Sequence, residues 1–418
     1  MRLGETANKQ ALEWGKPLDG IRVLALEQMQ SLPWATQLLA RLGADVVKVE
    51  HPVHGESGRG ALPAMRDPEG RQIGATFLRN NLNKRSIGLD LKVPKARQLL
   101  MALVPKFDVV AENFKAGALE ALGLGYQAVA DAHPGVIYLS VSGFGNTSES
   151  PYRDWPAYAG VAEAMSGIYE YSRLPNQAPI INPVGPLGDV GTASLAAVGV
   201  LAALLHRQRT GEGQYVDVSM LDCMVAFTDL VTNFWSMGVR RNGEDKPRPQ
   251  MILDAFRASD GWFMMQVGRE HQFERLAKIV GHREWLSDPR LADRQGWADS
   301  IEDVIRPAIE EWAAHKTKVE VCADMAAAGV AAGPCNNPRD VINDPHVAAR
   351  HMLVECPRTD DVQEPVLVPG NPVKMSKMTD GPDFRVPWLG EHTEQILREE
   401  LGLSTTEIQG LRDQSVIC

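Results

Sequence analysis

Residues 21–50 read IRVLALEQMQSLPWATQLLARLGADVVKVE, and this stretch decides the fold. Ile21–Leu26 and Ala44–Glu50 are short apolar runs typical of buried strands. Between them, Pro33–Leu42 has the apolar spacing of a helix, with proline near its first turn. Strand, helix and strand in this order indicate a parallel sheet rather than a hairpin.

The same alternation continues through the first third of the chain. Ser86–Leu91, Phe107–Ala111 and Val136–Val141 are further strand-like runs, and Pro94–Val104 has a helical pattern. Apolar strands interleaved with helices predict an α/β fold whose parallel sheet is covered on both faces. The long loop His51–Gly74 follows the second strand, at the edge where open α/β sheets bind ligands.

Beyond residue 150, the helix and strand patterns predict that the α/β unit continues and that a second unit follows it. Lys246–Pro249 has the composition of a linker, and a second unit is expected from about 250 to 345. The supporting segments are helices at 157–172, 188–208, 221–237, 300–313, 318–328 and 390–401, and strands at 214–218 and 261–267.

Composition indicates an ordinary soluble protein. At 418 residues the chain can bury a large core, and its net charge of −10 argues against nucleic acid as a partner. The five cysteines form no CxxC pair, which is typical of a reduced cytosolic protein. Residues 1–20 lack an apolar signal region, and the longest apolar run, Ala193–Leu205, is too short to span a bilayer. We therefore predict a cytoplasmic protein with no membrane partner.

Sequence signatures for several cofactors are absent. No GxGxxG follows the first strand, which argues against a nicotinamide cofactor, and no GxxxxGK[ST] loop is present. His346 and His351 have no third ligand near them in sequence, so we predict no metal site.

Asp189 is the strongest candidate for a reactive side chain. It lies in Pro186-Leu187-Gly188-Asp189-Val190-Gly191-Thr192, directly before the apolar helical run. The flanking glycines let a substrate approach the backbone, and a helix N-terminus favours an anion. Aspartate is also a preferred helix cap, so the local sequence leaves both roles open.

Two polar clusters border the predicted strands. Lys84 and Arg85 lie in Asn81-Leu82-Asn83-Lys84-Arg85-Ser86 and suit phosphate, although a solvated turn has the same composition. Asn113 and Phe114 lie in Glu112-Asn113-Phe114-Lys115-Ala116-Gly117, directly after the fourth strand. They supply an amide and an aromatic face for an adenine ring, and Lys115 beside them supplies a charge, although a plain strand-to-helix turn fits equally well.

In combination, these motifs resemble one family, the class III (CaiB/BaiF, formyl-CoA transferase-like) coenzyme A transferases. The resemblance runs over roughly residues 17 to 415. It rests on LDGIRVL (18–24), LGADVVKVE (42–50), NKRS (83–86), ENF (112–114), GD (188–189), RTGEGQ (209–214), Gly329–Pro334 with Asp344-Pro345-His346, and LGEHT (389–393).

The resemblance implies a fold and an assembly. A Rossmann-like large domain is built from both chain ends, and a smaller α+β domain lies between them. The expected division is 1–235 for the first part of the large domain, 236–345 for the linker and small domain, and 346–418 for the return with its helical tail. Two subunits are expected to form an interlocked homodimer.

The resemblance also implies a chemistry. Asp189 matches the catalytic nucleophile, which attacks an acyl-CoA thioester, passes through a mixed anhydride and an aspartyl-CoA thioester, and delivers CoA to an acceptor acid. Backbone N–H groups near Gly188 or Gly191 are expected to stabilise the oxyanions. CoA is then a substrate, with no tightly bound cofactor. The positions expected to line its site are Met29, Gln30, His51, Lys84, Arg85, Asn113, Phe114 and Tyr158.

Some positions depart from the family pattern. His51 and Ala121 replace arginines that many members carry near the nucleotide, and 247–251 lacks the glycine-rich loop of oxalate-specific members. Related α-methylacyl-CoA racemases need a histidine where this chain has Tyr158. That difference disfavours a racemase, and an intact Asp189 disfavours a CoA-binding protein without turnover, but both stay open as alternatives.

Overall fold

The structure, a computed structural model, describes residues 1–147, 149–171, 173, 176–181, 185–238, 250–360 and 362–418. Its contacts divide the chain into two compact units. Unit 1 is made by the described residues of Met1–Arg173, Ala178–Arg240 and Ala348–Cys418, and unit 2 by those of Leu174–Gln177 and Arg241–Val347. The linker predicted at Lys246–Pro249 lies outside the described residues.

Unit 1 is built on a six-stranded sheet in which every neighbouring pair is parallel. The strand order is β5-β2-β1-β6-β7-β8, so the chain starts near the middle and builds outward on both sides. This confirms the predicted α/β class. The strands are β1 (Arg22–Leu26), β2 (Asp45–Glu50), β5 (Lys84–Gly88), β6 (Val109–Glu112), β7 (Ile137–Ser142) and β8 (Gln214–Ser219).

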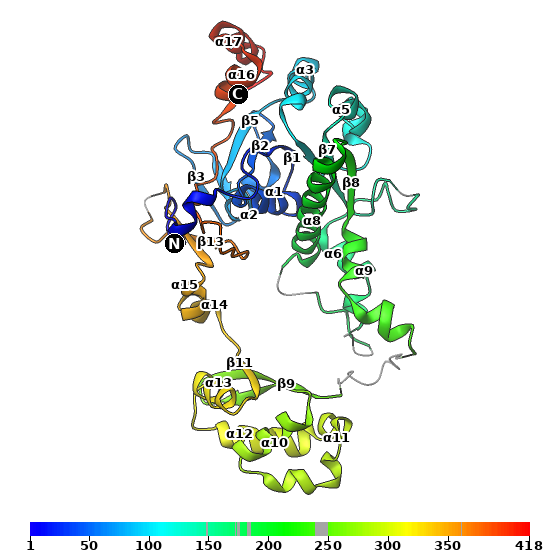
Figure 1. Cartoon of the computed structure of the whole chain (residues 1–418), viewed down its shortest axis with the longest axis vertical. Helices are drawn as coiled ribbons and strands as arrows, with labels where there is room; N and C mark the ends of the chain where they lie inside the picture. Colours follow the sequence, from blue (N-terminus) through cyan, green and yellow to red (C-terminus); the bar gives the residue numbers. More distant parts are fainter. Residues whose placement is uncertain (148, 172, 174–175, 182–184, 239–249, 361) are drawn as a thin grey trace. The chain divides into compact units, whose positions relative to one another are not determined.

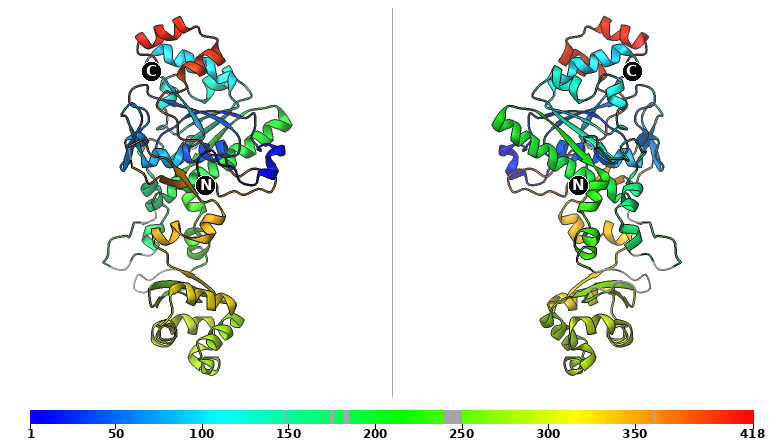
Figure 2. Two further views of the ribbon diagram at one scale, coloured as in Figure 1. Left: turned by 90° about the vertical axis from the view of Figure 1, so that its left-hand side faces the viewer. Right: turned by 90° about the vertical axis from the view of Figure 1, so that its right-hand side faces the viewer.

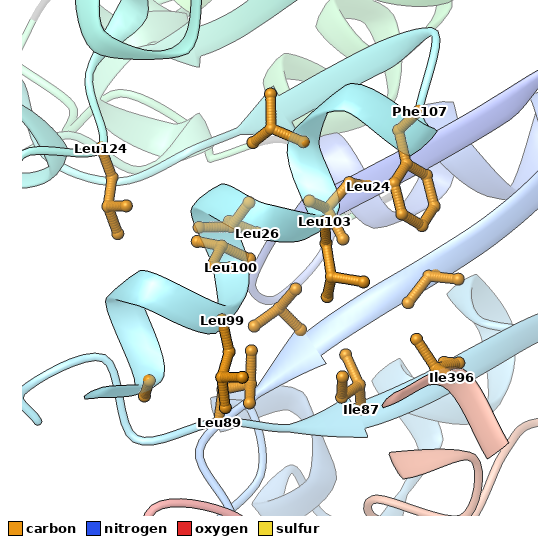
Figure 3. Close-up of a cluster of buried hydrophobic side chains, with 14 of the residues drawn as sticks. Leu24, Leu26, Ile87, Leu89, Leu99, Leu100, Leu103, Phe107, Leu124 and Ile396 are labelled. Atoms are coloured by element: carbon orange, nitrogen blue, oxygen red, sulfur yellow. The ribbon is translucent and has the colours of Figure 1, made fainter. Parts of the chain in front are cut away.

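One face of this sheet packs against helices from distant parts of the sequence. Leu24, Leu26 and Ile87 on the strands contact Leu99, Leu100 and Leu103 on α3 and Ile396 on α16 (Figure 3). Figures 1 and 2 show the two C-terminal helices beside α3. The helices of this face are α3 (Pro94–Leu103), α5 (Tyr126–Ala132), α16 (Thr393–Leu401) and α17 (Thr405–Asp413).

Helices α1 (Ser31–Arg41) and α8 (Leu187–Thr210) cover the other face and pack against each other. Alternate strand residues such as Val23 and Ala25 contact this layer, because successive side chains of a strand point to opposite faces. With 24 residues, α8 is longer than the apolar run predicted and is long and apolar enough to cross a membrane. Its Ala193, Ala196 and Val200 are instead buried against the sheet, as expected of a core helix.

The loop after β2 is ordered by buried charges. It contains a short hairpin of β3 (Ala64–Arg66) and β4 (Gln72–Gly74), followed by α2 (Ala75–Asn80). Arg59 in this loop forms a buried ion pair with Glu50 at 2.6 Å. Lys48 and Lys84 both contact the Glu27 carboxylate, at 3.3 and 2.6 Å. Each of these buried charges thus has an opposite charge beside it, which offsets the cost of burial.

Both ends of the chain belong to unit 1. The N-terminal amine donates to the Leu353 carbonyl, and the buried Arg41 forms an ion pair with Asp383 at 3.0 Å. Thr393 accepts a hydrogen bond from the N–H of Gly88 at the end of β5. The C-terminal segment also contributes a two-stranded sheet of β12 (Leu353–Cys356) and β13 (Val366–Pro369).

Unit 2 has an antiparallel sheet of its own, in the order β11-β10-β9, packed on an apolar helical layer. Phe256, Phe263 and Trp297 are among its buried side chains. Its elements are β9 (Ile252–Ala258), β10 (Gly261–Val267), α10 (Glu270–Ile279), α11 (Arg294–Asp299), α12 (Arg306–Ala313), α13 (Lys318–Ala327), β11 (Ala331–Pro334) and α14 (Pro338–Ile342); α15 (Pro345–Ala349) follows in the chain.

Several elements differ from the sequence expectation. The helix predicted at 157–172 is two short helices, α6 (Ala159–Met165) and α7 (Ile168–Tyr171), because Gly167 between them has a φ of 89°. The helix predicted at 221–237 is interrupted after α9 (Met220–Ala226). Strand β9 and helix α17 were not predicted. Helix α4 (Ala118–Ala121) is a single turn directly after the Asn113–Gly117 segment.

Candidate active site

Asp189 occupies the first turn of α8, but it does not cap the helix. Pro186 is the N-cap residue, so Asp189 is the third helical residue and is half-buried. No described residue donates a hydrogen bond to its carboxylate, and no hydrogen bond contributes to its pKa. Burial and the nearby negative charge of Glu163 raise the pKa of Asp189 to about 6. The Asp189 carboxyl group therefore titrates close to neutral pH, and such raised pKa values are common at functional sites.

The glycines beside Asp189 accommodate protein neighbours. A Cβ atom on Gly188 would lie 3.0 Å from the backbone of Ala159, and one on Gly191 would lie 2.4 Å from the Phe227 ring. Packing against Ala159 and Phe227 therefore accounts for both glycines, whereas the sequence interpretation was that they let a substrate approach.

The backbone N–H groups that were predicted to stabilise the oxyanions already donate hydrogen bonds within the protein. The N–H of Gly188 donates to Glu163 Oε1 at 2.8 Å, and that of Val190 donates to the Pro186 carbonyl. Gly191 lies inside α8.

A cavity of about 370 Å³ opens beside Asp189 at the carboxyl ends of β1, β6 and β7. Six of the predicted positions line it: Met29, Gln30, Asn113, Phe114, Tyr158 and Asp189. The sequence brings them together because parallel strands end at one edge of a sheet. Ser142, Gly143, Trp155 and Met220 complete much of the remaining wall.

The loop after β1 is held in an unusual conformation at the mouth of this cavity. Met29 has a φ of 63°, in the left-handed region that side chains rarely adopt. Its N–H donates to Glu56 Oε2 at 2.8 Å, and the neighbouring Gln28 forms two hydrogen bonds with the Asn113 side chain. These contacts fix the loop and compensate for the backbone strain.

His51 lies in a neighbouring cavity of about 270 Å³, which shares Gln28 and Phe114 with the first. Its ring stacks on His54, and Nδ1 accepts hydrogen bonds from the N–H groups of Val53 and His54. Leu26, Val49, Leu119 and Leu122 give this second cavity an apolar wall.

Lys84 and Arg85 are not brought to either cavity. The Lys84 ammonium is fully buried and contacts Glu27, Pro33 and Asn81. Burial lowers the pKa of Lys84 to about 8, in spite of the opposing effect of Glu27. Arg85 pairs with Asp45, which begins β2, whereas the cavities lie at the carboxyl ends of the strands. In this structure both cations stabilise the fold.

Two cations in the larger cavity were not among the predicted site residues. Lys115 and Arg153 line it, both are exposed, and neither forms an ion pair with a described carboxylate. Lys115 follows Asn113-Phe114 directly, so its position in that motif was a usable signal. Arg153 lies in an irregular segment with no pattern to single it out. No group of three or more His, Cys, Asp or Glu among the described residues is arranged to hold a metal ion.

Comparison with known proteins identifies the family. The model of CoA-transferase family III matches residues 18–393. The chain belongs to this family. Its members transfer CoA between acyl-CoA thioesters and carboxylic acids, and the chain is a class III CoA-transferase enzyme of this kind.

Characterised relatives and solved structures match over nearly the full length. A succinyl-CoA:mesaconate CoA-transferase of Haloarcula hispanica is 36% identical over 93% of this chain and 97% of its own. The succinyl-CoA–L-malate CoA-transferase β subunit of Chloroflexus aurantiacus is 34% identical over 96% of this chain and 98% of its own. The crystal structure of a CaiB/BaiF family protein from Brucella suis has a TM-score of 0.79 at 32% identity, over 92% of this chain and all of that one.

Proposed function

We propose that Asp189 is the nucleophile of this CoA transferase. Three observations support this: Asp189 lines a cavity at the carboxyl edge of the sheet, its carboxylate is not used by the described residues, and its pKa is raised to about 6. In the first step a carboxylate oxygen of Asp189 bonds to the acyl carbon, the C–S bond breaks, and CoA leaves as a thiolate. The product is an acyl-aspartyl anhydride.

The thiolate then attacks the Asp189 carbonyl carbon. The bond from that carbon to the bridging oxygen breaks, the donor acid leaves as a carboxylate, and an aspartyl-CoA thioester remains. An acceptor carboxylate attacks the thioester and repeats the two steps in reverse, which regenerates the Asp189 carboxylate. Because an activated acyl group is kept throughout, the exchange requires no ATP.

CoA is proposed to bind along the two adjoining cavities. Phe114 and His51 offer ring faces beside an apolar wall, which suits an adenine ring, while Met29, Gln30, Asn113 and Tyr158 line the route to Asp189. Lys84 and Arg85 stay predictions from the family motif, and their ion pairs would have to rearrange before either contacted phosphate.

The acids exchanged are proposed to be short dicarboxylic acids. The relatives described above are named for succinyl-CoA, whose acyl group keeps one free carboxyl, with mesaconate or L-malate, which carry two carboxyl groups. The cavity beside Asp189 contains two cations, Lys115 and Arg153, with no carboxylate partner among the described residues. One substrate carboxyl group would react at Asp189 while the other binds these cations, Arg153 in a bidentate manner.

We also propose a cytoplasmic homodimer of interlocked subunits, with CoA as substrate and no tightly bound cofactor. The exposed side of α8 supports a second copy, since Val198, Leu201 and Leu205 form an apolar stripe on unit 1. All five cysteines are free thiols, which fits a reducing compartment.

A panel of acyl-CoA donors and isotope-labelled acids, incubated without ATP and followed by mass spectrometry, tests the proposed substrates. Labelled succinate, mesaconate and malate should become CoA thioesters, and butyrate should react poorly. Arg153→Ala should raise KM for the dicarboxylic acids, with kcat changed less. Exchange that favours butyrate would refute the dicarboxylic assignment. Rapid α-deuteration of an α-methylacyl-CoA, with no acid-dependent exchange, would replace the transferase by a racemase.

A further inference from the structure

Glu163 is a buried carboxylate next to the proposed nucleophile. It lies on α6 and is 2% exposed. One oxygen accepts the N–H of Gly188, and the other accepts the hydroxyl of Tyr169. Among the described residues, no lysine, arginine or histidine forms an ion pair with it. A buried carboxylate without a cation is costly, so its retention needs a reason beyond packing.

The hydrogen bond from Gly188 ties Glu163 to the first turn of α8. Gly188 immediately precedes Asp189, and its lack of a side chain lets α6 approach, since a Cβ atom there would lie 3.0 Å from Ala159. A donor N–H in the first turn of a helix normally needs a capping partner, and no side chain caps this helix locally. Glu163 supplies that partner from α6 and thereby fixes the position of the backbone directly before Asp189.

Glu163 also places a negative charge near the Asp189 carboxylate. The elements packed against α8 carry other ionisable groups: Arg41 on α1, Tyr138 on β7, Tyr215 and Asp217 on β8, and Asp222 and Cys223 on α9. Of all these groups, the charge of Glu163 is the one that, with burial, raises the pKa of Asp189. The free Asp189 carboxylate is therefore repelled by its neighbour, whereas a neutral Asp189 is not.

We propose that Glu163 is a positioning residue that favours the covalent state of Asp189. This inference rests on the proposed nucleophilic role. When Asp189 bonds to the acyl carbon, its negative charge moves to the departing CoA sulfur, and both the anhydride and the aspartyl-CoA thioester leave Asp189 uncharged. Glu163 thus disfavours the free carboxylate without opposing either covalent intermediate, while its contact with Gly188 holds the attacking group in place.

The isosteric variant Glu163→Gln removes the charge and keeps an oxygen that can accept from Gly188. Wild type and variant are incubated at pH 7.5 with a fixed ratio of succinyl-CoA to succinate, quenched in acid, and analysed by intact-protein mass spectrometry. In Glu163→Gln the acid limb of kcat/KM should move to lower pH, because Asp189 loses the neighbouring negative charge. For each pH unit of that shift, the ratio of CoA-bound to free enzyme should fall about tenfold, since one pKa unit is a tenfold change in an equilibrium. The change in the adduct ratio and the shift of the acid limb both report the negative charge of Glu163.

Glu170→Gln is the matched control, because Glu170 is exposed and pairs with Arg173 outside the cavity. It should change neither the adduct ratio nor the acid limb. A purely structural role for Glu163 would lower the melting temperature or kcat of Glu163→Gln without moving the acid limb, and an unchanged adduct ratio in that folded variant would overturn the proposal.

Tyr169→Phe provides a second test if Glu163→Gln does not fold. It removes a hydrogen bond that partly compensates the negative charge of Glu163, so the repulsion of the Asp189 carboxylate should grow and the acid limb should move to higher pH. A shift to lower pH would contradict the proposal. Absence of any CoA adduct in the wild-type enzyme during turnover would instead refute the proposed nucleophile, so the two failures are distinguishable.

Discussion

Asn113 and Gln28 are joined by two reciprocal hydrogen bonds. The N–H of Gln28 donates to Asn113 Oδ1 at 2.9 Å, and Asn113 Nδ2 donates to the Gln28 carbonyl at 3.0 Å. The side chain at the end of β6 thus substitutes for the backbone pairing that stops where β1 ends. It also places Met29 and Phe114 on adjacent walls of the cavity.

Asn113→Ala should therefore loosen the loop after β1. Loss of both hydrogen bonds should lower the free energy of unfolding by about 1–3 kcal/mol, and KM for the acyl-CoA should rise because Met29 is no longer held. Urea denaturation and steady-state kinetics measure the two effects. Gln127→Ala is the control, since the Gln127 side chain donates to Asp131 on the exposed surface of α5, away from the site. An unchanged KM in Asn113→Ala would show that this brace does not serve the site.

Lys84→Met tests the buried position that the structure gives to Lys84. Removing this ammonium takes a donor from both Glu27 and Asn81, although Thr36 and Lys48 still contact Glu27, at 2.6 and 3.3 Å. The free energy of unfolding should fall by about 3 kcal/mol. Arg85→Ala breaks a partly exposed pair with Asp45 and should cost less than about 1 kcal/mol. Equal stability losses, with weaker CoA binding in both variants, would favour the phosphate role predicted from the motif.

Glu112 gives the fold a pH dependence. This buried carboxyl group ends β6, and burial raises its pKa to about 7, against the hydrogen bonds that it accepts from Ser140 and the N–H of Phe114. A carboxyl pKa that is higher in the folded state contributes stability below about pH 4.5, and that contribution is lost as the pH rises to about 7. The loss should be on the order of 3 kcal/mol.

Glu112→Gln should remove this dependence, because the amide does not ionise. Urea denaturation at pH 5 and pH 8 should show a smaller difference in unfolding free energy for the variant than for the wild type. Glu212→Gln is the control, because Glu212 is exposed in the short segment between α8 and β8. If the wild type and Glu112→Gln lose equal stability between these two values, Glu112 is not the group that titrates.

The activity should have an acid limb set by Asp189. The nucleophile must be ionised, and its pKa is raised to about 6, so kcat/KM should be level above neutral pH and fall tenfold per unit below about pH 6. The pH profile of CoA exchange between succinyl-CoA and a labelled acid measures this. A limb near pH 4 would mean that Asp189 has an ordinary pKa in the working enzyme.

The sequence predicted the sheet well because its signals are local. Short apolar runs such as Val136–Val141, interleaved with helical patterns, are typical of a parallel sheet covered on both faces, and β7 lies within one residue of this expectation. Asp189, Asn113 and Phe114 could be predicted as candidate site positions for a related reason, since each follows or precedes a predicted element. Parallel strands then bring these positions to one edge.

Contacts between residues that are distant in the sequence could not be predicted from such local patterns. The pairing of Lys84 with Glu27 joins residues 57 positions apart, so a basic turn and a buried counter-ion have the same local sequence. Glu163 lies 25 positions before Gly188, and only the packing of α6 on α8 gives it a partner. The N-cap of α8 is Pro186, so Asp189 lies inside the first turn and not at the cap position that the local sequence had left open.

Trapping of the covalent intermediate tests the central claim most directly. The enzyme is incubated with succinyl-CoA, treated with hydroxylamine, digested and analysed by peptide mass spectrometry. Hydroxylamine converts an activated carboxyl group to a hydroxamate, so the peptide that contains Asp189 should carry this modification, dependent on succinyl-CoA. Asp189→Asn should show neither modification nor CoA exchange, with activity reduced by several orders of magnitude. A hydroxamate on another residue, or a variant that keeps more than about a tenth of kcat, would contradict the nucleophilic role of Asp189.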